Sequence, residues 1–452
     1  MDNSRLMSLR LGFSEAQADE IQKHGLKAFL KKSFEPQQPV GLPDFLQNSS
    51  KTLAERKVQV TAAIAQGEDS FTAYKKQQKQ EFTDFKTWWT ARIMNTEYPL
   101  REKMTVFWHN HFVASGLKVK LPYWLFTHNN LLREHAFGNF RELTKMIIKS
   151  NAVLFYLDNT NNRKGNINEN LSRELMELFT LGFGNYSEAD IKNGAKGLAG
   201  LTVSENGGAY KPKIQDDETI TYFGKTGIFK ADELVDIIFE QPKIPYLITR
   251  KILQWFITDI PDEKSVLYYG DYFRKKDFEI EPLLFKIFTE EASKPGAGTK
   301  IKDPLLYILQ LTDLLNIKNI RPETIQVFAQ RQGMGFYSQY NVKGWSGGRD
   351  WLSIQNYTQR NAIAGWLCSG KTIAGAKIME GKLPMPDWNS NAGSLEIIAD
   401  FKRKLLVANV PELQDDFEQI LKDGFNSDPE MAADSVLKLF QFIAQMPEFQ
   451  LI

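Results

Sequence analysis

The sequence predicts a mainly α-helical protein, a multi-helix globular array with a small β-hairpin insert around residues 201–223. Three observations support this fold class. Apolar residues recur at helical spacing through most of the chain. Pro, Ser and Gly stand at the boundaries of these segments, as helix starts and stops require. Only residues 201–223 gather Gly, Thr, Tyr and Val in the short clusters that are typical of strands.

In the first 150 residues, small and rigid residues mark the ends of the helical segments. Gly25 and Gly67 follow two of them, and Pro99 and Pro122 begin two others. An aromatic and aliphatic stripe within residues 71–93 recurs at helical spacing, which predicts packing in a core. The predicted helices are residues 15–24, 26–34, 51–66, 71–95, 100–119, 122–135 and 140–150.

Helical patterns also fill most of the remaining chain. Residues 168–181 read as an amphipathic helix, and Ser187 with Asp190 resembles a capping box for the next one. Residues 293–304 read as a Gly/Pro/Lys linker, and residues 333–351, rich in Gly and aromatics, as an irregular segment. The other predicted helices are residues 188–200, 231–240, 245–259, 263–276, 280–290, 304–315, 322–332, 352–368, 394–408, 412–422 and 430–445.

Composition limits the class of protein. The chain has 452 residues, of which 42% are apolar, and 56 basic against 55 acidic residues. This balance gives no general footprint for nucleic acid. Cys368 is the single cysteine, so neither a disulfide within the chain nor a cysteine-based metal site is expected. No apolar run is long enough for a secretory signal or a membrane span, so we expect a soluble, cytoplasmic protein.

Length suggests two or three lobes. We expect an N-terminal helical region in residues 1–95 and a central helical core in residues 96–295 that carries the β insert. A C-terminal helical region would fill residues 296–452. The three regions are expected to form one continuous compact unit.

The first candidate site lies on the predicted helix 168–181, which an Asn-rich loop precedes. At about 100° per residue, Glu174 and Glu177 share one face of this helix, and Glu169 and Arg173 form an i, i+4 pair. One interpretation is a solvated charged face. The other is a carboxylate cluster, oriented by Arg173, that holds a cation or acts as acid and base.

The second candidate is the segment FWHNHF, residues 107–112, which holds His109 and His111. In a helix these two rings lie about 200° apart, so they face different neighbours unless the helix ends there. A histidine between aromatic residues is commonly a hydrogen-bonded core residue. The alternative is a metal site in which His109 and His111 join Glu174 and Glu177 around manganese, iron or zinc.

Two glycine-containing segments offer weaker anion sites. GWSGGR, residues 344–349, lacks the spacing of a phosphate-binding loop, but Trp345 and Arg349 are candidates for a binding wall. Arg163 precedes Gly165 and is a similar candidate. In both segments the glycines are explained equally well by tight turns.

Several stretches together resemble the bacterial family called domain of unknown function 1800. They are KMTVFWHNHFVAS (103–115), LLREHAFGNFRELTKMI (131–147), YLDNTNNRKGNINENLSRELMELFTLG (156–182), YSEADIKNGAKGLAGLTV (186–203), YFGKTGIF (222–229), YNVKGWSGGRDWLSIQNYTQRN (340–361) and PEFQ (447–450). The resemblance implies a bacterial protein in which WHNHF and NENLSRELMEL are family hallmarks. It also implies frequent export, hence a periplasmic alternative, and a gene neighbour encoding a sulfatase-like partner protein.

Two functions follow as hypotheses. The first is a hydrolase or other acid–base enzyme whose site combines Glu169, Arg173, Glu174 and Glu177 with His109 or His111. The second is a non-catalytic helical binding or scaffold protein that acts with a partner. In the second, the same residues form a buried polar network that fixes the fold.

Overall fold

The computed structural model of the chain describes residues 2–294, 298–369, 384–407, 410–422 and 429–452. Helices dominate this part of the chain, and its strands form two antiparallel pairs. The strand pairs are β1 (Leu201–Thr202) with β2 (Ala209–Tyr210), and β3 (Ile220–Tyr222) with β4 (Lys225–Gly227). The mainly α-helical class with a small β insert is therefore confirmed, and the insert continues to residue 227.

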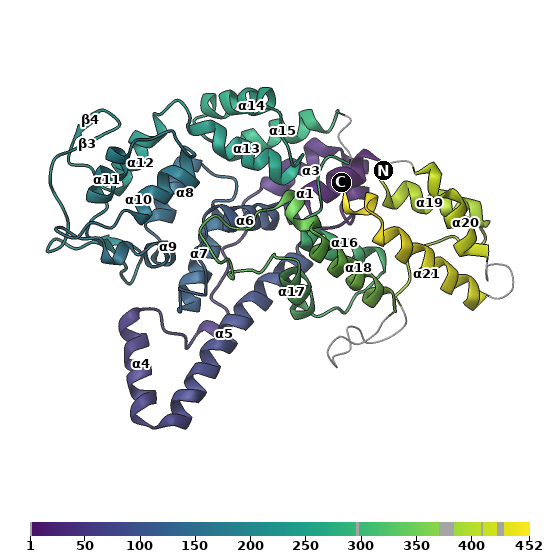
Figure 1. Ribbon diagram of the computed structural model, residues 1–452, viewed down its shortest axis with the longest axis horizontal. Helices are drawn as coiled ribbons and strands as arrows, with labels where there is room; N and C mark the ends of the chain where they lie inside the picture. Colours follow the sequence, from purple (N-terminus) through teal and green to yellow (C-terminus); the bar gives the residue numbers. More distant parts are fainter. Residues whose placement is uncertain (1, 295–297, 370–383, 408–409, 423–428) are drawn as a thin grey trace.

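The N-terminal region is helical, and its last two helices form a hairpin that projects from the body (Figure 1). Its helices are α1 (Asn3–Leu11), α2 (Ala18–His24), α3 (Leu26–Phe34), α4 (Leu53–Ala65) and α5 (Glu68–Asn95). Gly25 and Gly67 lie at φ 83° and 104° between these helices, where glycine adopts the required backbone without strain.

The apolar stripe of α5 is a core element only in its C-terminal half. Phe85, Trp89 and Ile93 are buried, whereas Phe71 and Tyr74 remain partly exposed on the projecting hairpin. The prediction of a core stripe is therefore wrong for the first half. A helix of 28 residues is about 42 Å long, and its N-terminal half extends beyond the body together with α4 (Figure 1).

The central region carries α6 at the middle of the molecule, with later helices arranged around it (Figure 1). α6 is buried along its length except at Asn110, and it ends at His111 instead of continuing toward residue 119. The helices of this region are α6 (Pro99–His111), α7 (Pro122–Glu134), α8 (Phe140–Ile148), α9 (Asn151–Tyr156), α10 (Asn170–Glu174), α11 (Glu188–Gly197), α12 (Ala231–Phe239), α13 (Ile244–Phe256), α14 (Glu263–Lys275) and α15 (Ile280–Glu291).

The buried charged side chains of α6 form hydrogen bonds to other elements. The Glu102 carboxylate accepts hydrogen bonds from Arg92, from Arg133 and from the indole of Trp89, at 2.6–3.0 Å. The Lys103 amine donates to backbone carbonyl oxygens of the α1 region. A helix that carries such residues can be covered on all sides because the carboxylate of Glu102 and the amine of Lys103 have hydrogen-bond partners.

The C-terminal region closes the fold against α6 and α13. The segment predicted as a linker is packed from residue 300 onward, because Lys300 and Lys302 are buried and donate to the backbone carbonyls of Gln254 and Phe449. The helices here are α16 (Pro304–Leu314), α17 (Pro322–Arg331), α18 (Ile354–Ser369), α19 (Ser394–Leu405), α20 (Gln414–Lys422) and α21 (Pro429–Gln445). Residue 408, the predicted end of α19, lies outside the described residues.

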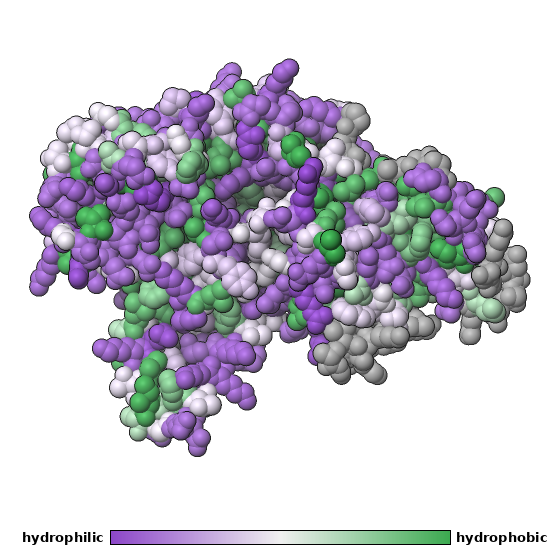
Figure 2. Space-filling view, viewed as in Figure 1, coloured by the Kyte–Doolittle hydropathy of each residue, from purple (hydrophilic) through white to green (hydrophobic). Residues whose placement is uncertain are grey.

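One continuous cluster of buried apolar side chains joins helices from all three regions. None of the helices in the described ranges has the length and apolarity that crossing a bilayer demands. Figure 2 shows one face of the molecule, which is mostly hydrophilic with scattered hydrophobic residues, some of them on the projecting hairpin. The division into three regions stays a prediction.

Candidate functional site

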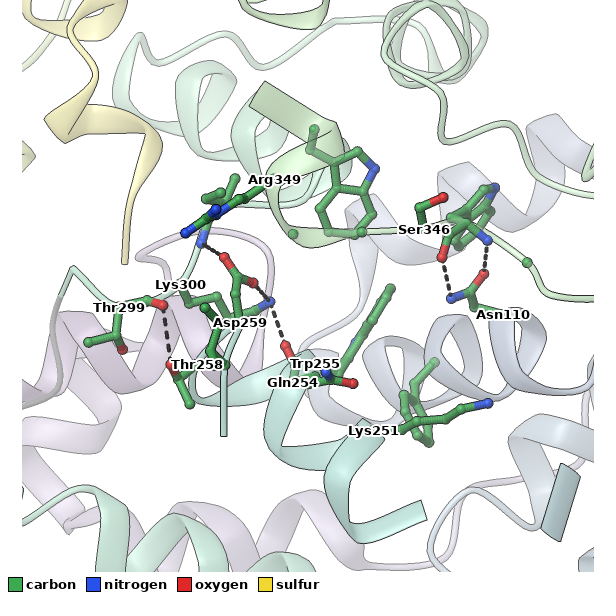
Figure 3. Close-up of a pocket in the computed structure, with 18 of the residues that line it drawn as sticks. Asn110, Lys251, Gln254, Trp255, Thr258, Asp259, Thr299, Lys300, Ser346 and Arg349 are labelled. Carbon is green, nitrogen blue, oxygen red and sulfur yellow. Dashed lines mark hydrogen bonds and ion pairs between the residues drawn. The ribbon is translucent and has the colours of Figure 1, made fainter. Parts of the chain in front are cut away.

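A cavity of about 1090 Å³ lies where the central and C-terminal regions meet (Figure 3). Four segments and Leu451 line it; the segments are the end of α6, the second half of α13 with the loop that follows, residues 298–301, and the irregular segment 341–351. The first of these contains the FWHNHF segment and the last contains GWSGGR. Two stretches that the sequence singled out separately therefore share one cavity.

Asn110 joins these two stretches directly. Its side-chain oxygen accepts a hydrogen bond from the backbone N–H of Trp345 at 2.6 Å, and its side-chain nitrogen donates to the Trp345 carbonyl at 3.4 Å. Gly344 precedes this clamp at φ 79°, and a Cβ there would lie 2.5 Å from the Asn110 backbone oxygen. Only glycine allows the loop to approach the end of α6 this closely.

His111 lies on the cavity wall with both ring nitrogens engaged. Nε2 is 3.0 Å from the Phe179 carbonyl oxygen, and Nδ1 is 3.1 Å from Lys251 Nζ. A carbonyl oxygen can only accept, so Nε2 carries the proton and Nδ1 accepts from the lysine. Burial holds the pKa of His111 well below its usual range, and the Lys251 charge lowers it further. The ring is therefore neutral.

The carbonyls that hold His111 and Lys251 come from the motif helix, which consists of α10 and the π-helical turn that follows it. α10 passes into a π-helical turn, Leu175–Thr180, in which Leu181 N–H donates to the Met176 carbonyl. The carbonyl oxygens near the end of this turn lack backbone partners, as at any helix C-terminus. His111 binds the one at Phe179 and Lys251 binds the one at Leu178, 3.1 Å away. The motif helix thus contributes backbone oxygens to the cavity wall.

Lys251 lines the cavity and has a pKa that the fold shifts strongly. Burial lowers the pKa of its amine from 10.5 to about 8. Two of its hydrogen-bond directions go to His111 Nδ1 and to the Leu178 carbonyl. A tetrahedral amine then has one direction left, which holds a third proton below the pKa and a lone pair above it.

The opposite side of the cavity is built around Asp259. Its carboxylate accepts from the backbone N–H of Ile301 at 2.9 Å and lies 3.5 Å from Lys300 Nζ. Lys300 also donates to the Gln254 carbonyl at 2.8 Å. Figure 3 shows Asp259, Lys300 and Arg349 on one side and Lys251 and Asn110 on the other. These contacts fix the 298–301 segment against the end of α13.

Positive charge dominates the lining. Lys251, Lys300, Lys343 and Arg349 contribute cations, whereas Asp259 is the one acidic residue among the described residues that line the cavity. Lys343 and Arg349 are both exposed. The cavity therefore has an excess of positive charge on its accessible walls.

His109 faces away from His111, as the helix geometry predicts. Its Nε2 accepts from the Gln339 amide at 2.7 Å and from the Tyr337 backbone N–H at 3.3 Å, so its Nδ1 carries the proton. Burial lowers the pKa of His109 well below 6.5, so this ring is also neutral. Nδ1 is buried without a hydrogen-bond partner in the described structure. His109 packs beneath the irregular segment and does not line the cavity.

Glu169 and Arg173 lie on the surface. Arg173 binds Glu169 and Glu188, each at 3.1 Å, and all three side chains are at least a third exposed. This is the solvated ion pair that one interpretation of the sequence describes, extended by a second carboxylate. Arg163 is exposed in a tight turn that its backbone forms with Asn166. None of these residues lines the cavity.

Neither Glu174 nor Glu177 lines the cavity. Burial raises the pKa of the half-buried Glu174, the Glu177 charge raises it further, and Arg173 and Lys343 oppose both effects. Glu177 accepts a hydrogen bond from the Tyr186 hydroxyl at 2.7 Å. Glu174 interacts electrostatically with Lys343, which lines the cavity.

No group of three or more His, Cys, Asp or Glu side chains in the described ranges is arranged to hold a metal ion. Both ring nitrogens of His111 are hydrogen-bonded, to the Phe179 carbonyl and to Lys251. His109 is hydrogen-bonded to Gln339. The residues of the metal hypothesis therefore do not form one ligand set as they stand.

The sequence interpretation missed Lys251, Asp259 and Asn110. A signal for Lys251 is present, since it lies three residues after Ile248 and four before Trp255, on the apolar face of α13. A lysine on a buried face needs a partner or a lowered pKa. Asp259 and Asn110 carry no comparable signal, because their partners are backbone groups distant in sequence.

Comparison with known proteins adds the family. No curated protein and no solved structure matches the chain significantly. A family model described as protein of unknown function, DUF1800, matches residues 6–451. The match spans the motif helix, the FWHNHF segment, α13 and the glycine-containing segment that together build the cavity. The chain belongs to the DUF1800 family.

Proposed function

We propose that this protein is an acid–base enzyme that acts on a polar small molecule bound in the cavity, with Lys251 as the proton-transferring group. The main observation in support of this proposal is that the Lys251 amine, with a pKa of about 8, is fixed on the wall of a cavity of about 1090 Å³. A general base is most effective when its pKa is close to the working pH.

Two hydrogen-bond acceptors hold the Lys251 amine in place, and neither of them takes up its proton. The Leu178 carbonyl and neutral His111 each accept one hydrogen bond from the amine, which leaves its third hydrogen-bond direction for a ligand. Above its pKa, Lys251 can accept a proton from a water or a substrate hydroxyl. Once protonated, it can return that proton to a leaving oxygen. Hydrolysis is the simplest reaction that uses both steps.

His111 is a positioning residue in this proposal. Its Nε2 proton is committed to the Phe179 carbonyl, and burial opposes a second proton on Nδ1. Replacement by a side chain without a ring acceptor would free the Lys251 amine to rotate. Glu174 is proposed as a supporting group, because its charge acts on Lys343 at the cavity wall.

Hydrolysis of a panel of 4-nitrophenyl esters, phosphates, sulfates and glycosides tests the proposal, with release of nitrophenolate as the measurement. For a substrate that is turned over, kcat/KM should rise about tenfold per pH unit below the Lys251 pKa of about 8 and level off above it. The rise follows because only the deprotonated amine accepts a proton.

Lys251→Met should abolish this turnover. The matched control is Lys164→Met, since Lys164 is an exposed lysine that does not line the cavity. The proposal is wrong if Lys251→Met retains wild-type turnover. It is equally wrong if an NMR titration of 13C-methylated lysines finds the Lys251 amine near 10.5 rather than near 8. If Lys251 titrates near 10.5, a binding or scaffold function becomes the better account.

A further inference from the structure

Among the described residues, six exposed polar side chains line the cavity, and three of them, Lys343, Ser346 and Arg349, belong to one segment, residues 343–349. Four aromatic side chains also line the cavity, but Phe107, Trp255, Trp345 and Trp351 are each at least nine-tenths buried. They form the walls and leave little of their faces for a ligand. Recognition therefore depends on the cations, the amides and the free backbone donors.

Within the part of the chain that the structure describes, the side chains of Arg349 and Lys343 form no hydrogen bond and no close ion pair. Both are exposed, both line the cavity, and no acidic side chain in the described structure lies within ion-pair distance of either. By contrast, the amine of Lys300 is engaged by Gln254 and Asp259. Arg349 and Lys343 are thus available to a ligand.

The backbone beside these cations adds further donors. The N–H groups of residues 346–349 make no hydrogen bond within the described structure, whereas the preceding N–H, that of Trp345, is held by Asn110. Gly347 and Gly348 lie at φ 74° and 52°, conformations that turn the backbone sharply at this point. Consecutive free N–H groups beside a guanidinium are a recurrent arrangement for binding oxyanions.

We propose that residues 343–349 form an oxyanion subsite, so that the molecule bound in the cavity carries a carboxylate, sulfate or phosphate group. Arg349 gives a planar pair of donors, Lys343 a point charge, and the backbone of Ser346–Arg349 the remaining donors. This inference rests on the proposed function, because it names the substrate class of the same cavity.

The two ends of the cavity then have separate roles. Arg349 lies on the opposite side of the cavity from Lys251 in Figure 3. An acid group bound at Arg349 would leave the rest of the molecule to extend toward the Lys251 amine. The volume of about 1090 Å³ exceeds what a free inorganic anion needs, which favours an organic molecule that bears the acid group.

Isothermal titration calorimetry with sodium phosphate, sodium sulfate and sodium acetate, at matched ionic strength, tests the subsite. Wild type should bind at least one of the three saturably at millimolar concentration, and Arg349→Ala should weaken that binding about tenfold or more. Lys343→Ala should weaken it less, because an ammonium lacks the paired donors. The strongest of the three titrations identifies the acid group.

Arg163→Ala is the matched control, since Arg163 is equally exposed but does not line the cavity. It should leave the affinity unchanged. The subsite is overturned if none of the three anions binds wild type, or if Arg349→Ala and Arg163→Ala bind as wild type does. Both arginines are exposed, so both variants should fold, which circular dichroism checks.

The outcomes separate the subsite from the proposed chemistry. Anion binding that depends on Arg349, together with a Lys251 amine that titrates near 10.5, would keep the subsite and reject Lys251 as the base. A pH profile that depends on Lys251, without anion binding, would reject the subsite alone.

Discussion

At the scale of single residues, burial determines which of the charged groups have pKa values shifted toward the neutral form. Lys251 and Glu174 both have pKa values shifted toward their neutral forms, and in both cases burial is the leading cause. Arg173, which the sequence places in the same motif as Glu174, is exposed and bound to two carboxylates. Sequence spacing groups Arg173 with Glu174, but exposure to solvent separates them.

Glu174→Gln distinguishes a functional carboxylate from a structural one. Because its pKa in the folded state is raised above 4.5, the ionised Glu174 is less favourable in the fold than in the unfolded chain. That penalty is absent below pH 4.5 and fully present above the folded-state pKa. We therefore expect Glu174→Gln to match or exceed wild-type thermal stability at pH 7 and to lose any advantage near pH 4.

Glu169→Gln on the same helix is the control for this measurement. It removes a surface ion pair with Arg173, so its effect should stay within about 1 kcal/mol. Melting temperatures followed by circular dichroism at the two pH values check both variants. A marked loss of stability in Glu174→Gln at pH 7 would instead support the buried-network hypothesis, in which this carboxylate fixes the fold.

At the scale of elements, the cavity depends on two helix ends and one loop. The end of α6 presents Asn110 and His111, and the π-helical turn after α10 presents the carbonyls of Leu178 and Phe179. The spacing rule of 100° per residue describes α10 but not the π-helical turn, which has more residues per turn. The sequence places Glu177 on a helix face only if α-helical geometry is assumed, but the helix becomes π-helical at Leu175.

Gly344→Ala tests how tightly the loop is held against α6. The added Cβ would overlap the Asn110 side chain and lie 2.5 Å from its backbone oxygen, at a φ of 79° that alanine adopts only with strain. We expect a loss of about 3 kcal/mol in the free energy of unfolding, from strain and overpacking together. Urea denaturation measures it.

Gly365→Ala provides the contrast within α18. Its added Cβ would meet Gln441 at 3.6 Å, an ordinary contact, and its backbone φ is not positive. Because alanine favours a helix interior, this variant should gain up to about 1 kcal/mol. Equal effects of the two substitutions would mean that the loop does not press on Asn110.

At the scale of the whole molecule, α6 is the element that the other regions share. Its Glu102 joins α5 through Arg92 and Trp89, and α7 through Arg133. Its far end joins the C-terminal segment through Asn110. One helix therefore connects the projecting hairpin, the central helices and the cavity, which makes its buried polar contacts important for the stability of the whole fold.

Glu102→Gln should destabilise the protein by about 3–5 kcal/mol at pH 7, because it leaves a buried guanidinium without its counter-charge. Burial alone would raise the pKa of Glu102, but Arg133 and Arg92 lower it below 4.5. The ion-pair stabilisation is therefore present above pH 4.5 and is lost as the pH falls through the lowered value. The difference between variant and wild type should shrink in acid.

Glu188→Gln is the matched control, since it removes an exposed partner of Arg173 and should leave the free energy of unfolding close to that of wild type. Guanidinium chloride titrations at pH 7 and pH 3 measure both variants. A Glu102→Gln protein as stable as Glu188→Gln at pH 7 would mean that α6 does not depend on this ion pair.

The sequence by itself determined the helical class, most helix boundaries and the family. Local signals suffice for these: α3 begins and ends at the residues that the pattern predicts, and Ser187 with Asp190 forms the expected capping box. The sequence also singled out FWHNHF, the motif helix and GWSGGR. These are properties of neighbouring residues, which act over a few turns of chain.

Only the tertiary structure decided which of these segments meet and through which atoms. The contacts of the cavity join residues 110 with 345, 111 with 179 and 251, and 259 with 301. Most of these contacts use a backbone carbonyl or N–H group, which nearly all residue types have. A pattern of side chains in the sequence therefore cannot predict them. The lowered pKa of Lys251 likewise comes from burial by distant segments. Spacing along a chain cannot specify such contacts, because packing brings the partners together.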